Sequence, residues 1–263
     1  FMFRFQHDRI QQASYDLITG TVRTQRHLRI GRRLLQQMQA AGHDEQLFDV
    51  LNHLNNSREL IEDQEERKAI AQLNLKAGRR AMNNNAIQPA LYYFEAGMEL
   101  LSRDQASETF KDLLISRSEC AYLYGNYQAS EQLFDAALAD AKTNIAKADI
   151  LARKMALYEN TQRHELALEA AKQGLGLLGI RVPLNAGQLD VLRELLRVRW
   201  KLRGRTTRAL FENRDMEATD QRLAMKILMN MWGPCYLLQK QNLLAWKILR
   251  MVNLSVDHGN SIE

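Results

Sequence analysis

The sequence predicts an all-α protein in which antiparallel helix pairs stack as an α-α superhelix, or solenoid. Proline and glycine are scarce, with 3 and 13 residues among 263, although sandwiches and barrels need many turn residues. Good helix formers such as Ala, Leu, Gln, Arg and Glu dominate the composition. Apolar residues recur at helical spacing along most of the chain, and the helical segments repeat in pairs.

Apolar periodicity predicts a series of helices separated by short breaks from residue 7 to residue 178. Asp63 and Asn144 are the expected N-caps of two of them, because their side chains can accept a hydrogen bond from the first turn. Breaks as short as Gly125-Asn126 require consecutive helices to lie antiparallel. The expected ranges are 7–18, 22–40, 44–56, 64–83, 86–102, 105–124, 127–141, 144–160 and 163–178.

A pattern of small, large and small residues recurs in the segments 87–100, 127–140 and 164–177, with a period of 40 and then 37 residues. Such a stripe lets the second helix of a pair pack closely on the first helix and on the next pair. The stripe consists of Ala90, Phe94 and Gly97, then Ser130, Phe134 and Ala137, then Ala167, Ala171 and Gly174. With the turn over 124–127, this pattern resembles the tetratricopeptide repeat, so we expect a tetratricopeptide-like superhelix with elongated helices. An irregular helical bundle is the alternative.

The regular pattern of paired helices is interrupted after Leu178. The stretch 179–187 is the longest loop-like segment and should form a hinge or an ordered crossover. Helices are expected again over 187–204, 217–232 and 236–258, with a break and restart at Gly233-Pro234. We therefore expect helical repeats over 21–180 and further helical repeats over 181–263, the latter being an array truncated at the C-terminus.

Composition and motifs exclude several classes of function. Cys120 and Cys235 show no metal or redox spacing, and free cysteines fit a reducing cytoplasm. No apolar run approaches the ~20 residues of a membrane-spanning helix. The sequence contains no GxxxxGK[ST], GxSxG or HExxH motif and no kinase signature, so we expect no catalytic residue, no metal site and no cofactor in this chain.

His7-Asp8 is a residue pair that could bind a metal ion. A metal-dependent phosphohydrolase would need further His and Asp ligands, and the later histidines form no spaced ligand set. The simpler interpretation is that His7 and Asp8 open the first helix, where an acidic side chain interacts favourably with the helix N-terminus.

A basic stripe is predicted over 191–210. If the helix continues through Gly204, basic residues at steps of three and four form one face, namely Arg193, Arg197, Lys201, Arg205 and Arg208. The core would then be contacted by Leu192, Leu195, Leu196 and Leu202, with Trp200 near the boundary. The stripe could bind an acidic protein surface, nucleic-acid phosphate or an anionic membrane, or it could be a solvated face.

The opening segment FRFQHDRIQQASYDLI, residues 3–18, resembles the end of the winged-helix subdomain of STAND-type signalling ATPases. The segments HLRIGRRLL, LFDVLNHLN, LNLKAGRRA, MKILMNMWGPCYL and MVNLSVDHGNS resemble the helical-repeat region that follows this module in large bacterial multidomain kinases. The resemblance implies that 1–20 is a winged-helix remnant and that His7 faces the nucleotide of an upstream ATPase core. It also implies that the parent protein is an ATPase and kinase, with histidine or Ser/Thr kinase fusions, that uses ATP or ADP and Mg²⁺. The resemblance implies no cofactor in this chain.

The leading hypothesis is a non-catalytic, cytoplasmic protein-interaction and regulatory module of a bacterial signal-transduction protein. It would couple the binding of a partner protein or a neighbouring domain to the upstream nucleotide switch. One alternative is a structural spacer or oligomerisation element. Another is a nucleic-acid-binding transcriptional regulator segment that uses the 193–208 basic stripe.

Overall fold

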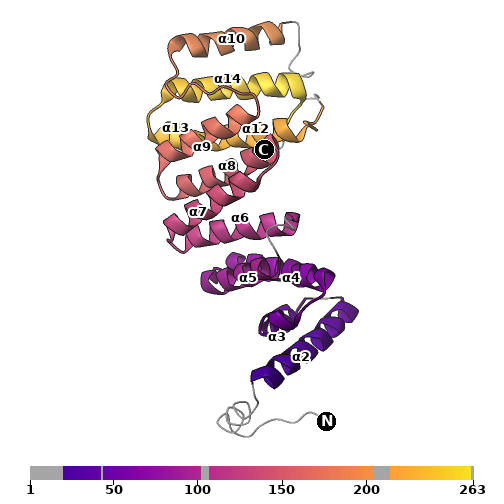
Figure 1. The fold of residues 1–263 in the computed structure, drawn as a ribbon. Coiled ribbons are helices and arrows are strands. Elements are labelled where there is room, and N and C mark those ends of the chain that lie inside the picture. The colour runs from indigo at the N-terminus through magenta and orange to yellow at the C-terminus, as the bar shows by residue number, and fades with distance from the viewer. Residues whose placement is uncertain (1–19, 43, 102–106, 204–213, 262–263) are drawn as a thin grey trace. The chain divides into compact units, whose positions relative to one another are not determined.

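The computed structural model describes residues 20–42, 44–101, 107–203 and 214–261, and within these ranges the chain is helical, without a β-strand (Figure 1). The predicted all-α class is therefore confirmed. The chain divides into two compact units between Ser130 and Glu131. The first unit contains α2 (Gly20–Ala41), α3 (Leu47–Asn55), the short 3₁₀ helix η1 (Arg58–Leu60), α4 (Gln64–Asn83), α5 (Ile87–Leu100) and α6 (Glu108–Leu123). Helix α7 (Tyr127–Asp140) crosses the boundary.

The second unit contains α8 (Asn144–Asn160), α9 (His164–Leu177), α10 (Gln188–Leu202), α12 (Thr219–Asn230), α13 (Trp232–Leu237) and α14 (Gln241–His258). An isolated bridge joins Asp215 and Asn260. The predicted winged-helix remnant at 1–20 and the helix at 7–18 lie outside the described residues, apart from Gly20, which begins α2. The division into repeats over 21–180 and 181–263 stays a prediction.

The same turn joins the helices of several pairs. In each turn one residue adopts positive φ, and the next N–H donates to a carbonyl five residues earlier, which is the Schellman arrangement that ends a helix. The positive-φ residues are Asn85 between α4 and α5, Gly125 between α6 and α7, Gln162 between α8 and α9, and Gln239 between α13 and α14. The bonds run from Ala86 to Ala81, Asn126 to Ala121, Arg163 to Tyr158 and Lys240 to Cys235, at 2.9, 2.9, 2.8 and 2.9 Å.

The small and large residues predicted to recur at each crossing are core residues. Phe94 is fully buried where α5 packs on α4, and Phe134 is buried on α7. Gly78 on α4 leaves room for the Phe94 ring, because a Cβ at position 78 would lie only 2.3 Å from it. A pair of buried amides, Asn55 and Asn74, also joins α3 to α4, with each Nδ2 donating to the other Oδ1 at 2.9 and 3.0 Å. The stacking of these pairs as a tetratricopeptide-like superhelix stays a prediction.

The second unit departs from consecutive pairing after α9. Helix α12 packs on α8, α9 and α14, whereas α10 packs on α14 (Figure 1). The segment 178–187 carries the chain from α9 to α10 and contains the buried side chains of Ile180 and Val182. It starts with a further Schellman bond, from the N–H of Ile180 to the carbonyl of Leu175 at 2.8 Å. Of the two structures expected for this stretch, the ordered crossover is the one observed.

Two local predictions were wrong. Asp63 caps α4 as expected, but the cap of α8 is Thr143, not Asn144: the Thr143 hydroxyl accepts from the N–H of Ala146 at 3.1 Å. The helix expected over 236–258 is divided into α13 and α14, because the turn at Gln239 interrupts it. The restart predicted at Gly233-Pro234 is confirmed, since both residues lie in the first turn of α13, where proline is tolerated.

Replacing Gly78 with alanine should destabilise the protein. The new methyl group would overlap the buried Phe94 ring, so we expect the free energy of unfolding to fall by about 1–3 kcal/mol. Gly176→Ala is the matched control, because no atom lies within 4 Å of its Cβ position and alanine favours a helix by ~1 kcal/mol. Urea unfolding of both variants checks this, and equal stabilities would contradict the packing of α4 on α5.

Acidification should weaken the contact between α2 and α3. The Nδ1 atoms of His27 and His53 lie 2.9 Å apart, an arrangement that needs at least one unprotonated nitrogen as acceptor. Burial, followed by the charges of His53 and Arg23, lowers the pKa of His27. Below the ordinary value of 6.5 the unfolded chain takes up a proton that the folded chain resists, so stability is lost as pH falls through the lowered pKa.

Urea midpoints at pH 7.5 and pH 5.5, for the natural chain and for His27→Gln, measure this effect. The natural chain should lose more stability on acidification than the variant does. Equal losses of stability in the two proteins would contradict a role of the histidine pair in the pH dependence.

Candidate functional site

Helix α10 buries an acidic residue at the centre of its inner face. Glu194 is only 4% exposed, and its carboxylate accepts hydrogen bonds from Arg197 Nη1 at 2.5 Å and from Asn253 Nδ2 at 2.8 Å. Arg250 Nη1 on α14 lies 4.0 Å from the same carboxylate. Because a buried carboxylate needs such partners, this cluster determines which side of α10 faces α14.

The opposite side of α10 presents large apolar residues to solvent. We call it the α10 ridge; it consists of Leu189, Leu192, Leu196 and Trp200. Leu189 is 80% exposed and Trp200 is 76% exposed, and helical spacing places the four side chains on one face. The prediction that Leu192, Leu195 and Leu196 face the core was therefore wrong, because Glu194 and Val198 occupy the inner face.

The predicted basic stripe is interrupted. The prediction required a helix that continues through Gly204. Helix α10 ends at Leu202 and Arg203 has an extended backbone, so the stripe does not continue on this helix. Lys201 forms an ion pair with Asp257 on α14 at 2.6 Å. Helical spacing places Arg193 and Arg197 on one side of the α10 ridge and Arg199 on the other, whereas Arg203 follows the end of the helix. Arg205 and Arg208 lie outside the described residues.

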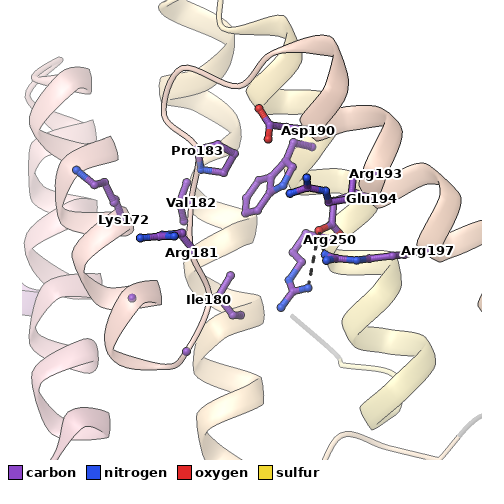
Figure 2. Close-up of a pocket in the computed structure, with 13 residues that line it drawn as sticks. Lys172, Ile180, Arg181, Val182, Pro183, Asp190, Arg193, Glu194, Arg197 and Arg250 are labelled. Atoms are coloured by element: carbon purple, nitrogen blue, oxygen red, sulfur yellow. Dashed lines mark hydrogen bonds and ion pairs between the residues drawn. The ribbon is translucent and has the colours of Figure 1, made fainter.

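A cleft of about 770 Å³, the α10 cleft, opens beside this helix (Figure 2). Helix α9 contributes Lys172 and Gly176, and α14 contributes Trp246 and Arg250. The crossover contributes Gly179, Ile180, Arg181, Val182 and Pro183, and α10 contributes Asp190, Arg193, Glu194 and Arg197. Figure 2 shows Lys172 on the α9 side, Ile180 to Pro183 along the crossover, and the arginines of α10 and α14 on the other side.

The α10 cleft contains both predicted and unpredicted residues. Arg193 and Arg197 were predicted as part of an interaction stripe, and the structure places both at the cleft. Lys172, Arg181 and Arg250 were not predicted, since they come from segments that only the crossover brings together. The alternation of buried Ile180 and Val182 with exposed Arg181 was a visible signal of an extended, half-buried segment.

A second buried charged residue, Lys247, has structural partners. Lys247 Nζ donates to the carbonyls of Leu228 and Met229 at 3.2 and 3.3 Å, at the end of α12. Burial lowers the pKa of Lys247 and raises that of Glu159.

Among the described residues no group of His, Cys, Asp and Glu could hold a metal ion, and none of the described helices is long and apolar enough to cross a membrane. His7 lies outside the described residues.

The tryptophans divide between core and surface. Trp246 is buried in α14. Trp200, which was expected near the boundary of the core, is exposed. Trp232 is 55% exposed and stacks on Tyr236 with ring centroids 5.4 Å apart. Large apolar residues that are exposed side by side often mark an interaction site.

Comparison with known proteins finds a partial similarity. The chain is 26% identical over 229 residues to "Hybrid signal transduction histidine kinase G" of Dictyostelium discoideum. The match covers 77% of this chain and 7% of that protein, so the chain spans a small part of the relative's length. No protein-family model matches the chain, and no solved structure matches it.

Removing the buried carboxylate should loosen α10. Glu194→Ala leaves Asn253 and the neighbouring guanidinium groups without their acceptor, so we expect the free energy of unfolding to fall by about 2–3 kcal/mol. Faster hydrogen exchange should be concentrated in α10. Glu217→Ala, at an exposed site, should change stability by less than ~0.5 kcal/mol. Unchanged exchange in α10 after Glu194→Ala would show that the cluster does not hold the helix.

Proposed function

We propose that this chain is a non-catalytic, protein-binding and regulatory helical-repeat module of a signal-transduction protein, and that its partner docks on the α10 ridge. The observation that carries the proposal is an amphipathic helix with its apolar side toward solvent and a buried carboxylate toward its neighbour. A single exposed leucine is ordinary, but a row of leucines ending in a tryptophan is typical of an interface.

The ridge can supply useful binding energy. Covering one exposed leucine contributes about 1.5–3 kcal/mol at full burial, and tryptophan is enriched among residues that dominate interfaces. The straight row of Leu189, Leu192, Leu196 and Trp200 suits a second helix packed along α10, with its own apolar residues at steps of three and four.

The charges beside the ridge indicate the chemistry of that partner. Arg193 and Arg197 lie on one flank and Arg199 on the other, and Arg203 follows the end of the helix. The acidic side chains on α10 are already engaged: Asp190 accepts from the N–H of Gly187 at 2.9 Å, and Glu194 is buried. An amphipathic helix with an apolar stripe and acidic flanks is therefore the complementary partner.

The similarity to a hybrid signal transduction histidine kinase supports the signalling role. Since the chain corresponds to 7% of that protein, kinase and ATPase chemistry, with its ATP or ADP and Mg²⁺, would belong to other parts of a large cytoplasmic parent protein. The bacterial origin, the STAND module upstream and the nucleotide contact of His7 stay predictions. A partner on the ridge would shift that upstream switch only if it bound one state of the switch more tightly than the other.

Peptide binding tests this proposal. The probe is a fluorescein-labelled amphipathic peptide of about 18 residues, with leucines at steps of three and four and glutamates on both flanks. Leu196→Ser combined with Trp200→Ser should weaken binding at least about tenfold by fluorescence anisotropy. Arg199→Glu combined with Arg203→Glu should weaken it as well, and a peptide with lysine in place of glutamate should bind poorly.

Trp232→Ser combined with Leu237→Ser is the matched control, because it removes an exposed tryptophan and leucine of α13 and should leave binding unchanged. Equal binding by the ridge variant would contradict the proposal. A chain that dimerises in light scattering, and stops doing so in the ridge variant, would favour the oligomerisation alternative. Salt-dependent DNA binding that is lost in Arg197→Glu with Lys201→Glu would favour the nucleic-acid alternative.

A further inference from the structure

The α10 cleft carries an excess of positive charge. Its basic residues are Lys172, Arg181, Arg193, Arg197 and Arg250, and its acidic residues are Asp190 and Glu194. Both acids are used within the fold, since Asp190 caps the start of α10 and Glu194 is held by Arg197 and Asn253. The basic side chains of the lining therefore outnumber its acidic side chains, and neither acidic side chain is left to neutralise the excess.

Two of these five cations have no ion-pair partner among the described residues. Lys172 pairs with Glu169 at 3.2 Å, but within the described part of the chain no ion pair engages Arg181 or Arg193. Arg250 Nε is buried and has no hydrogen-bond partner among the described residues, although the same guanidinium faces Glu194. A buried donor without an acceptor costs free energy, and this one belongs to a guanidinium group that lines the cleft.

The cleft also has an apolar wall. Ile180, Val182 and Pro183 of the crossover line it (Figure 2). Trp246 of α14 also lines it, and Ile180, Val182 and Trp246 are largely buried. Its volume of about 770 Å³ lies within the range of small-molecule sites and exceeds the needs of a bare inorganic anion. The ligand should therefore combine a charged group with an apolar or aromatic body.

The arrangement of the cations favours a phosphate group over a carboxylate. A single arginine fork can satisfy a carboxylate, whereas a phosphate monoester presents more acceptor oxygens and a charge near −2. The arginines of the cleft come from separate segments, with Arg181 on the crossover, Arg193 and Arg197 on α10, and Arg250 on α14. Donors from different directions suit a tetrahedral dianion.

We propose that the α10 cleft binds a small organic phosphate, with the phosphate at the arginines of α10 and α14 and the apolar part against the crossover. This site is separate from docking on the α10 ridge and does not depend on it. Arg250 belongs to the cleft alone, whereas Arg199 borders the ridge on the side away from Arg193.

Calorimetric titration of the whole chain tests the site. The probes are phenyl phosphate, adenosine 5′-monophosphate and inorganic phosphate, with phenylacetate as the carboxylate counterpart. At least one of the two organic phosphates should bind at least about tenfold more tightly than inorganic phosphate and than phenylacetate. Its binding should weaken at pH 5, because a phosphate monoester loses its second charge below a pKa of about 6.

Substitutions locate the bound phosphate. Arg193→Gln removes an exposed guanidinium that forms no ion pair with another described residue, so it should leave the fold intact while weakening phosphate binding at least about tenfold. Arg250→Gln should do the same, and circular dichroism checks that the fold survives the loss of its contact near Glu194. Arg199→Gln on the far side of the same helix is the matched control and should bind as the natural chain does.

The proposal is overturned if none of the three phosphates shows saturable binding at millimolar concentration. It is also overturned if Arg193→Gln binds as well as Arg199→Gln does. Tighter binding of a phosphoserine peptide than of either small organic phosphate would assign the cleft to a phosphorylated protein segment and would overturn the small-molecule assignment. Loss of peptide docking in the ridge variants, without loss of phosphate binding, would separate this site from the proposed docking function.

Discussion

The burial of one carboxylate controls the architecture of the C-terminal unit. An ionised acid is costly to remove from water unless its oxygens are paired and hydrogen-bonded. Glu194 meets this condition only with its side of α10 against α14, where Asn253 and Arg250 supply partners that reinforce Arg197. A half-turn of the helix would bury leucines in place of Glu194 and leave those partners without their acceptor. The leucine row therefore remains at the surface.

That orientation creates two different surfaces on a single helix. The crossover after α9 carries the chain to the far side of α14, and its buried Ile180 and Val182 form a wall opposite the arginines of α10. The result is a positively charged cleft on one side and an apolar ridge on the other. Arg193 and Arg197 lie between the two, so an anion in the cleft would reduce the positive charge available to an acidic partner on the ridge.

Local features of the fold were predictable from the sequence, because local chemistry determines them. Periodicity located most of the described helices, Asp63 forms the N-cap that was predicted for it, and the stripe through Phe94 and Phe134 is buried. The orientation of α10 was not predictable, because its leucine pattern alone favours burial of the leucines. The partners of Glu194 on α14, Arg250 and Asn253, lie 56 and 59 residues further along the chain. The α10 cleft was missed for the same reason, since it requires the crossover to bring α9, α10 and α14 together.

Cysteine accessibility tests the orientation of α10 most directly. The natural thiols give little background, because Cys120 and Cys235 are buried and burial raises the pKa of each to about 11. In single variants, Leu196→Cys should react with a maleimide as fast as an open thiol does, and Val198→Cys should react roughly 100-fold more slowly, because its modification requires α10 to detach from α14. Equal rates, or faster modification of Val198→Cys, would contradict the burial of Glu194 and the surfaces that depend on it.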